Sequence, residues 1–173
     1  MQALEELLLL SRRGLLGAAA VLLLPRRAQA DQTAAILEAA AARILPSDDG
    51  PGAREAKVGR FLERQLAGDL AELQPAFAQL ARLIDLWAQK SSGMAFVALP
   101  AEAQDRILAQ LAGGQIPARG LPQEVLFRAL HGLVLEGFLS DPVHGGNDGM
   151  IGWHSIGFAT PHLRRPGLPH GHR

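Results

Sequence analysis

The sequence predicts an all-α protein, with a single domain of about five helices and an irregular Gly/Pro-rich segment near the C-terminus. Alanine and leucine supply most of the apolar residues, while aromatic residues make up only 5% of the chain. These two residues lose least free energy on entering a helix. Apolar residues recur with the helical period in five segments, and no stretch alternates convincingly in the manner of a β-strand.

Three helices are predicted in the first half of the chain, each with its own apolar stripe. The stripes fall within residues 33–45, 58–66 and 77–87. Pro46 and the loop after it close the first helix, because proline cannot continue a helix. Pro75 is suited to the first turn of the third helix, where its missing N–H would have no partner in any case.

Two more helices are predicted, and each begins after a proline. Pro100 opens a helix that ends at Gly113-Gly114. Pro122 opens the last and most hydrophobic helix, whose broad stripe predicts a central, largely buried element. The stripe consists of Val125, Leu126, Ala129, Leu130, Leu133, Val134 and Phe138. From Ser140 onward the glycines and prolines predict an irregular tail.

Residues 1–30 have the composition of an export signal. A basic start is followed by about ten apolar residues, Leu15–Leu24, and by small residues at Ala28 and Ala30 that fit signal-peptidase cleavage before Asp31. The apolar run is short for a membrane span, which needs about 20 residues. We therefore expect a mature domain of residues 31–173.

The signal also contains paired arginines. Ser11, Arg12, Arg13, Leu15 and Leu16 match the pattern of a twin-arginine signal. The interpretation is export by the twin-arginine translocase to the periplasm, with an ordinary secretory signal or an uncleaved anchor as the alternatives. The twin-arginine route carries folded proteins, usually because a cofactor must be inserted before export.

Composition and motifs argue against a cofactor in this chain. There is no cysteine, which excludes disulfides, thiolate metal sites and cysteine nucleophiles. The sequence contains no dinucleotide-binding glycine motif, no phosphate-binding loop, no zinc-protease motif and no haem-attachment motif. The formal net charge is zero, so nucleic acid is not an expected partner.

Two Gly/Pro-rich segments resemble conserved signatures of a known family. They are "ILPSDDGPGAREAKVGRFL" (residues 44–62) and "DPVHGGNDGMIGWHSIGF" (residues 141–158). With the intervening helices they resemble the gluconate 2-dehydrogenase subunit 3 family over nearly the whole mature chain. His144, where the family usually has tyrosine, and "ATPH" after Phe158 depart from the pattern. The matching residues are Ile44, Leu45, Pro46, Asp48, Pro51, Gly52 and Ala53, then Asp141, Pro142, Gly145, Gly146, Asn147, Gly152, Trp153, Ile156, Gly157 and Phe158.

The resemblance implies a small, non-catalytic subunit of a membrane-associated dehydrogenase complex in the periplasm. In that family the large subunit is a flavoprotein of the glucose-methanol-choline oxidoreductase type that carries FAD. A multi-haem c-type cytochrome commonly passes the electrons onward. The flavoprotein folds around its FAD inside the cell and can be exported in association with a subunit that bears the signal. No catalytic, cofactor-binding or metal-binding residue is expected in this chain.

The second segment admits both a structural and a partner-binding interpretation. Glycines beside Asn147 favour tight turns, and the side chains of Asp141 and Asn147 can accept hydrogen bonds from nearby backbone N–H groups. In the structural interpretation, Asp141 caps or stops the preceding helix. Trp153 and Phe158 are candidates to anchor in a partner's pocket, because large aromatic side chains dominate binding energy. Alternatively, both fold back on the chain's own helices.

Clustered carboxylates and histidines raise the alternatives of acid–base catalysis and of metal or haem binding. Asp48, Asp49 and Glu55 crowd the first segment, where capping of the next helix is expected rather than acid–base catalysis. A free-standing periplasmic helical protein that binds metal or haem through its C-terminal histidines is the alternative function. Their spacing matches no familiar ligand set. These histidines are His131, His144, His154, His162, His170 and His172.

Overall fold

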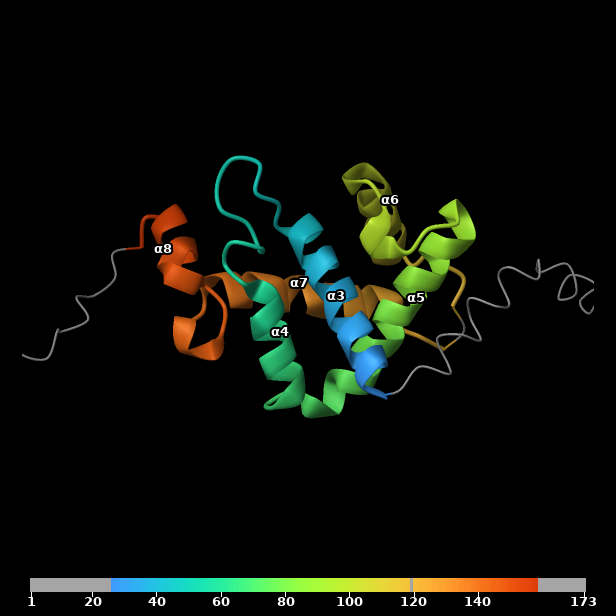
Figure 1. The fold of residues 1–173 in the computed structure, drawn as a ribbon, viewed down its shortest axis with the longest axis horizontal. Helices are drawn as coiled ribbons and strands as arrows, with labels where there is room; N and C mark the ends of the chain where they lie inside the picture. Colours follow the sequence, from blue (N-terminus) through green and yellow to red (C-terminus); the bar gives the residue numbers. More distant parts are fainter. Residues whose placement is uncertain (1–25, 119, 159–173) are drawn as a thin grey trace, which may run out of the picture.

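The computed structural model describes residues 26–118 and 120–158, which form an all-α domain (Figure 1). In this part of the chain there are six α-helices and no strand, which confirms the predicted fold class. The α-helices are α3 (Arg26–Ile44), α4 (Val58–Ala67), α5 (Gln74–Ser92), α6 (Ala101–Ala112), α7 (Gln123–Leu139) and α8 (Ile151–Ser155). Short 3₁₀ turns are η1 (Ala71–Leu73), η2 (Phe96–Ala98), η3 (Pro142–His144) and η4 (Asp148–Met150).

The five predicted helices correspond to α3 through α7. Pro75 lies in the first turn of α5, and Pro100 and Pro122 immediately precede α6 and α7. The first helix is longer than predicted, since it begins at Arg26 rather than at Thr33. None of the helices within the described residues is long and apolar enough to cross a membrane.

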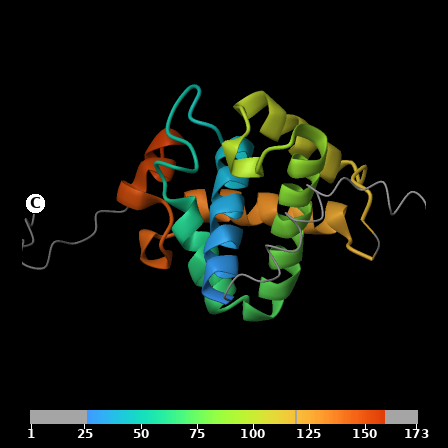
Figure 2. The same cartoon turned by 45° about the vertical axis from the view of Figure 1, so that its right-hand side comes forward.

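The core lies between α7 and the helices that cross it. In Figures 1 and 2, α7 runs across one side of α3, α4 and α5, and it contacts all three as well as α6 and α8. Large side chains from α4, α5, α6 and α7 are fully buried there, and Ile36 and Leu37 of α3 are buried as well. Their burial supplies most of the hydrophobic stabilisation. The fully buried side chains include Phe61, Leu62, Phe77, Leu80, Ile84, Leu111, Leu130 and Val134, with Phe96 from η2.

The helix α7 is central but not largely buried on all sides. Leu126, Leu130, Val134 and Phe138 face the core, whereas Val125, predicted to lie in the buried stripe, is 53% exposed. The broad apolar stripe therefore exceeds the face that α7 buries. The reason is that α7 lies across the other helices on one side of the domain, so none of the described helices packs on its far side.

Two sets of polar contacts link α3 to α6 and α5 to the turn η2. Arg43 near the end of α3 forms a two-pronged ion pair with Asp105 of α6, with N–O distances of 2.7 and 2.8 Å. The buried carboxylate of Asp85 in α5 accepts from the backbone N–H of Phe96 at 2.8 Å and from Gln89 Nε2 at 2.7 Å. Asp85 thereby holds the chain as it turns from α5 toward α6.

The segment after Ser140, predicted to be irregular, has no long helix within the described residues and is made of short turns. It contains η3, η4 and the short helix α8. Single residues with positive φ separate these turns, among them Gly145 (φ 103°) and Asn147 (φ 46°). The sequence does not reveal these turns, because each is too short to show a periodic apolar pattern and glycines lie among them.

Candidate functional site

The two motif segments lie together at one end of the domain, where the loop between α3 and α4 approaches α8 (Figure 1). The backbone N–H of Asp148 donates to the carbonyl of Ala56 at 3.2 Å. Lys57 Nζ lies 2.8 Å from Asp148 Oδ2. Arg64 Nη1 donates to the carbonyl of Val143 at 2.9 Å. Residues more than ninety positions apart, such as Ala56 and Asp148, therefore form one composite surface, called here the motif platform (residues 45–57 and 140–158).

The first motif segment is a compact loop organised around Glu55. Glu55 Oε2 accepts from Ser47 Oγ at 2.6 Å and from the backbone N–H of Gly52 at 2.9 Å. The hydroxyl of Ser47, followed by backbone N–H donors, holds the pKa of Glu55 below its ordinary value. A β-carbon at Gly52 would lie 2.6 Å from the carbonyl oxygen of Leu45, so this crossing requires glycine.

The predicted capping of α4 by loop carboxylates is wrong. The helix begins at Val58 after Lys57, which has φ 54° and makes no side-chain cap. Glu55 is used inside the loop, where it closes the turn that starts at Gly52. Asp48 and Asp49 are exposed. Pro46 and Pro51 are half-buried and Gly52 is buried, so these motif residues shape the loop.

Asn147 is the most deeply buried polar residue of the second segment. Its side chain is fully buried, donates from Nδ2 to the carbonyl of Ser140 at 2.8 Å and accepts at Oδ1 from the N–H of Gly152 at 2.8 Å. These bonds join the end of α7 to the start of α8. A buried amide with both ends satisfied specifies the local conformation, because losing either partner would leave a polar group unpaired.

Three motif glycines allow this segment to lie directly on neighbouring helices. A β-carbon at Gly146 would overlap the carbonyl oxygen of Gly137, and one at Gly152 would overlap that of Phe138. A β-carbon at Gly145 would lie 2.8 Å from Arg64 Cδ. The glycines thus permit close contact with the backbone of α7 and with the Arg64 side chain of α4, in addition to turning the chain.

Asp141 does not cap α7, which ends at Leu139. Its Oδ1 accepts from the N–H of Val143 at 2.9 Å and so caps the following turn η3, in which Pro142 occupies the first position. The expected hydrogen bond to a nearby backbone N–H is present. The expected end-capping of the preceding helix is wrong, since the acceptor faces forward along the chain.

The two aromatic residues of the segment behave differently. Trp153 is half-buried and donates from Nε1 to the carbonyl of Leu139 at 2.6 Å, so it folds back on the chain's own helix. Phe158 packs on Trp153 with 5.5 Å between ring centroids, yet it is 47% exposed. Ile156 is 60% exposed. Gly157 has φ 67°, which turns the chain between Ile156 and Phe158. Ile156 and Phe158 in the platform, with Leu139 at the adjoining end of α7, are exposed apolar side chains and are called here the C-terminal patch.

The remaining candidate residues divide by location. His131, His144 and His154 are exposed, and within the described ranges no three His, Asp or Glu side chains are placed to hold a metal ion. His162, His170 and His172 lie outside the described residues, as do Ser11, Arg12, Arg13, Leu15 and Leu16. Ala28 and Ala30, the predicted cleavage residues, lie in the first two turns of α3.

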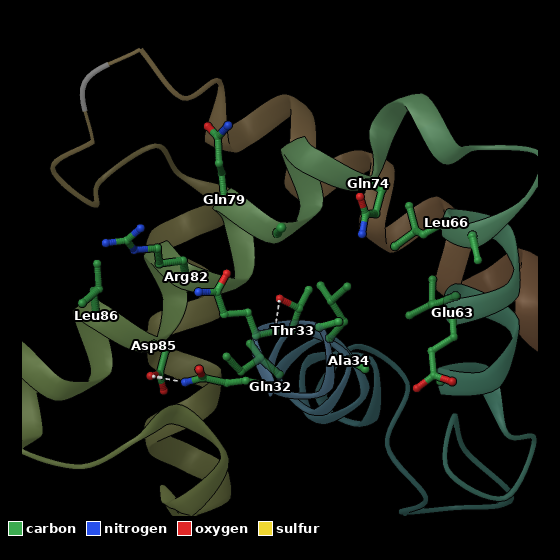
Figure 3. A pocket seen from close by; sticks show the side chains of 18 residues that line it. Gln32, Thr33, Ala34, Glu63, Leu66, Gln74, Gln79, Arg82, Asp85 and Leu86 are labelled. Carbon is green, nitrogen blue, oxygen red and sulfur yellow. Dashed lines mark hydrogen bonds between the residues drawn. The ribbon is translucent and has the colours of Figure 1, made fainter. Parts of the chain in front are cut away.

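A second candidate site was not predicted from the sequence. It is a groove of about 560 Å³ between α3, α4 and α5 (Figure 3), called here the three-helix groove. Ile36, Leu37, Leu62, Leu66 and Leu86 give it an apolar lining. Polar side chains labelled in Figure 3 stand around it, and Gln32 Nε2 lies 3.3 Å from Asp85 Oδ2. Only the packing of three helices creates this hollow, so periodicity within one helix gave no signal of it.

Comparison with known proteins supplies the identity of the chain. Searches of curated proteins and of solved structures each return no match. The sequence model of a protein family, described as gluconate 2-dehydrogenase subunit 3, matches residues 31–161. This range contains both motif segments, helices α4 to α8 and all of α3 except its first five residues. The chain belongs to the gluconate 2-dehydrogenase subunit 3 family.

Proposed function

We propose that this protein is the non-catalytic small subunit of a periplasmic, FAD-dependent alcohol or sugar dehydrogenase of the gluconate type. It escorts the flavoprotein through the twin-arginine route and stabilises it after export. Family membership carries this proposal, because the family is named for a subunit of a dehydrogenase. The flavin belongs to the glucose-methanol-choline-type partner, and haem c to a possible cytochrome subunit near the cytoplasmic membrane.

The arrangement of the motif platform supports a binding role. Its motif residues make contacts within the chain. Asn147 and the glycines hold the backbone against α7, and Glu55 holds the first loop. What the platform presents outward is the C-terminal patch, an apolar surface held on a rigid base. Rigid, exposed aromatic and aliphatic side chains bind partners with little loss of conformational entropy.

The N-terminal sequence supports the export role. The family match begins at Asp31, the residue that follows the predicted cleavage site. Residues 1–30 thus precede the family domain and carry the paired arginines Arg12 and Arg13. A subunit that bears such a signal and forms its own core can fold, bind its partner and leave the cell together with it.

The test is to change Arg12 and Arg13 to lysine and to locate both subunits by cell fractionation. Both proteins are expected to remain in the cytoplasm, because the translocase reads the arginine pair. The control changes Arg26 and Arg27 to lysine, which keeps all charges and leaves the pair intact. If the flavoprotein still reached the periplasm when the pair is changed, the escort role would be wrong.

The alternative of a free-standing metal- or haem-binding protein has no support from residues 26–118 and 120–158, where no metal-ligand group is assembled. Elemental analysis and a visible spectrum of the purified chain distinguish the two functions. The proposed subunit is expected to carry neither metal nor chromophore in stoichiometric amount.

A further inference from the structure

We infer that the three-helix groove is the docking site for the chain's own apolar leader, residues 15–24, in the uncleaved precursor. The occupant is a segment of the same chain rather than a partner protein or a second copy. The inference goes beyond the proposed function, since it concerns what the precursor does with its signal before any partner or translocase acts.

The groove has the chemistry of a site for an apolar helix. Leu62, Leu66 and Leu86 lie along it with Ile36 and Leu37, whereas Glu63, Gln79 and Arg82 stand at its borders (Figure 3). An amphipathic or apolar helix that lies in such a groove buries its side chains against leucines and leaves the polar border in water. Small residues on all three helices leave the space open, namely Ala30, Ala34, Gly59, Ala67 and Ala78.

The leader is tethered at the groove itself. The helix α3 begins at Arg26, one residue after Pro25 and two after Leu24, and Gln29 and Ala30 already line the groove. A segment joined this closely has an effective concentration in the millimolar range without any partner. No other apolar segment of the sequence outside the described residues is attached so near.

The sequence at the junction favours a change of direction. The residue before a proline is disfavoured from helical angles, so Leu24 is a poor link in a straight helix that would continue α3 away from the domain. A connection of two to five residues is enough for two helices to lie antiparallel. Leu24 and Pro25 would form a connection of two residues, which leaves residues 15–23 for the docked helix.

The dimensions of the two elements agree. Groove-lining residues run from Gly59 to Ala67, nearly all of α4 (Val58–Ala67). At 1.5 Å per residue this wall is about 15 Å long, and a helix of the nine remaining leader residues would be about 14 Å long. The leader is rich in leucine, and removing leucine side chains from water is favourable.

Docking would link release of the leader to unfolding of the first turns of α3. Cleavage after Ala30 would remove the leader together with the first turns of α3, including two residues that line the groove. In the precursor, Thr33 Oγ1 donates to the carbonyl of Gln29 at 2.9 Å, so the peptide bonds near the cleavage site are held in a helix. Release of the leader from the groove and opening of this turn are then one local unfolding event.

The absence of cysteine from the chain permits a clean cross-linking test. Single cysteines replace Ala18, Ala19 or Ala20 in turn, each paired with Ala78→Cys in the groove. The full-length precursor is purified from cells that lack the translocase and treated with a short bis-maleimide. The matched control pairs the same leader positions with Ala109→Cys, an exposed position on α6, the helix that Arg43 ties to the opposite end of α3.

An intramolecular product is expected with Ala78→Cys and not with Ala109→Cys. Equal products at both positions, or none at Ala78→Cys, would contradict docking. A product that joins two chains would assign the groove to a second copy. A groove cysteine that becomes blocked only in the presence of the flavoprotein would assign the groove to the partner. Either assignment overturns the inference.

Proteolysis provides an independent measurement. Ala78→Arg fills the groove and is expected to speed thermolysin cleavage within the leader by about tenfold, because cleavage follows the population of the released state. Ala109→Arg is the control and leaves the rate unchanged. A wild-type leader that is cut as fast as that of Ala78→Arg would contradict docking. Export of the flavoprotein enters neither measurement, so this inference and the proposed function can fail separately.

Discussion

Gly146 lies against Gly137 with no room for a side chain between their backbones, since a β-carbon on Gly146 would overlap the carbonyl oxygen of Gly137. Gly137 itself has the ring of Phe61 2.7 Å from where its β-carbon would be. A chain of close contacts therefore runs from the motif platform through α7 to the core residue Phe61 of α4. The platform is built into the domain and is not an appendage of it.

Gly146→Ala tests this packing. The added methyl group must displace α7 or the platform, and overpacking of this kind costs about 1–3 kcal/mol of unfolding free energy. Gly132→Ala is the matched control, because the β-carbon at this exposed position on α7 meets nothing within 4 Å. The control is expected to stabilise the helix by about 0.5–1 kcal/mol. Denaturant unfolding measures both, and equal effects of the two changes would contradict the close contact.

Asn147→Gly tests the buried amide. Glycine keeps the positive φ of Asn147 but removes the bonds to Ser140 and Gly152. We expect a loss of about 2–3 kcal/mol, from two buried hydrogen bonds and the polar groups left unpaired. The amide of Gly152 should lose protection from hydrogen exchange. Asp148→Asn, which alters only the exposed pair with Lys57, is the control, and a protected Gly152 amide in Asn147→Gly would contradict the assigned role.

Much of the helical architecture was predictable because it depends on local patterns. Pro75, Pro100 and Pro122 mark helix starts for steric reasons that hold in any fold. The start of α3 was predicted too late, since residues 26–32 are arginine, glutamine, aspartate and alanine and show no apolar period. The exposure of Val125 was missed because a stripe on one helix does not reveal how many neighbours cover it.

The sequence indicates which residues belong to the candidate site but not which contacts they make. The glycines at 145, 146 and 152 were expected to turn the chain, and their close approach to α7 depends on contacts far from them in the sequence. Glu55 was expected to cap α4, yet a competing backbone donor, Gly52, lies nearer in the folded loop. The three-helix groove requires three helices to be placed, which no single segment encodes.

The ion pair between Arg43 and Asp105 gives stability that depends on pH. The hydrogen bond from Arg43 lowers the pKa of Asp105, so the contribution is complete above the unfolded value of about 3.9 and is lost as pH falls through the lower folded value. Both side chains are partly exposed, so Asp105→Asn should cost no more than about 1 kcal/mol at pH 7. This difference from wild type should vanish in acid. A difference that persisted in acid would contradict this role of the ion pair.

Ser47→Ala tests the organisation of the first motif loop. The hydroxyl of Ser47 is the largest cause of the lowered pKa of Glu55, so its removal is expected to move that pKa upward toward the ordinary value. An NMR titration of the Glu55 carboxyl carbon measures the shift. Ser92→Ala removes a hydroxyl bonded to Ala88 at the end of α5 and should leave Glu55 unchanged. An unchanged pKa in Ser47→Ala would show that the 2.6 Å hydrogen bond is absent in solution.

Phe158→Ala tests the C-terminal patch as the partner surface. Phe158 is 47% exposed and touches Trp153 with one side of its ring, so the isolated chain should lose only about 0.5–1.5 kcal/mol of unfolding free energy. If the exposed side anchors in the flavoprotein, affinity should fall by about 2 kcal/mol, or roughly thirtyfold. Val125→Ala removes a side chain of similar exposure on the far end of α7 and should leave binding intact. Titration of the purified subunits measures the affinities and calorimetry the stabilities. Equal affinity of the Phe158 and Val125 variants would place the partner surface elsewhere on the domain.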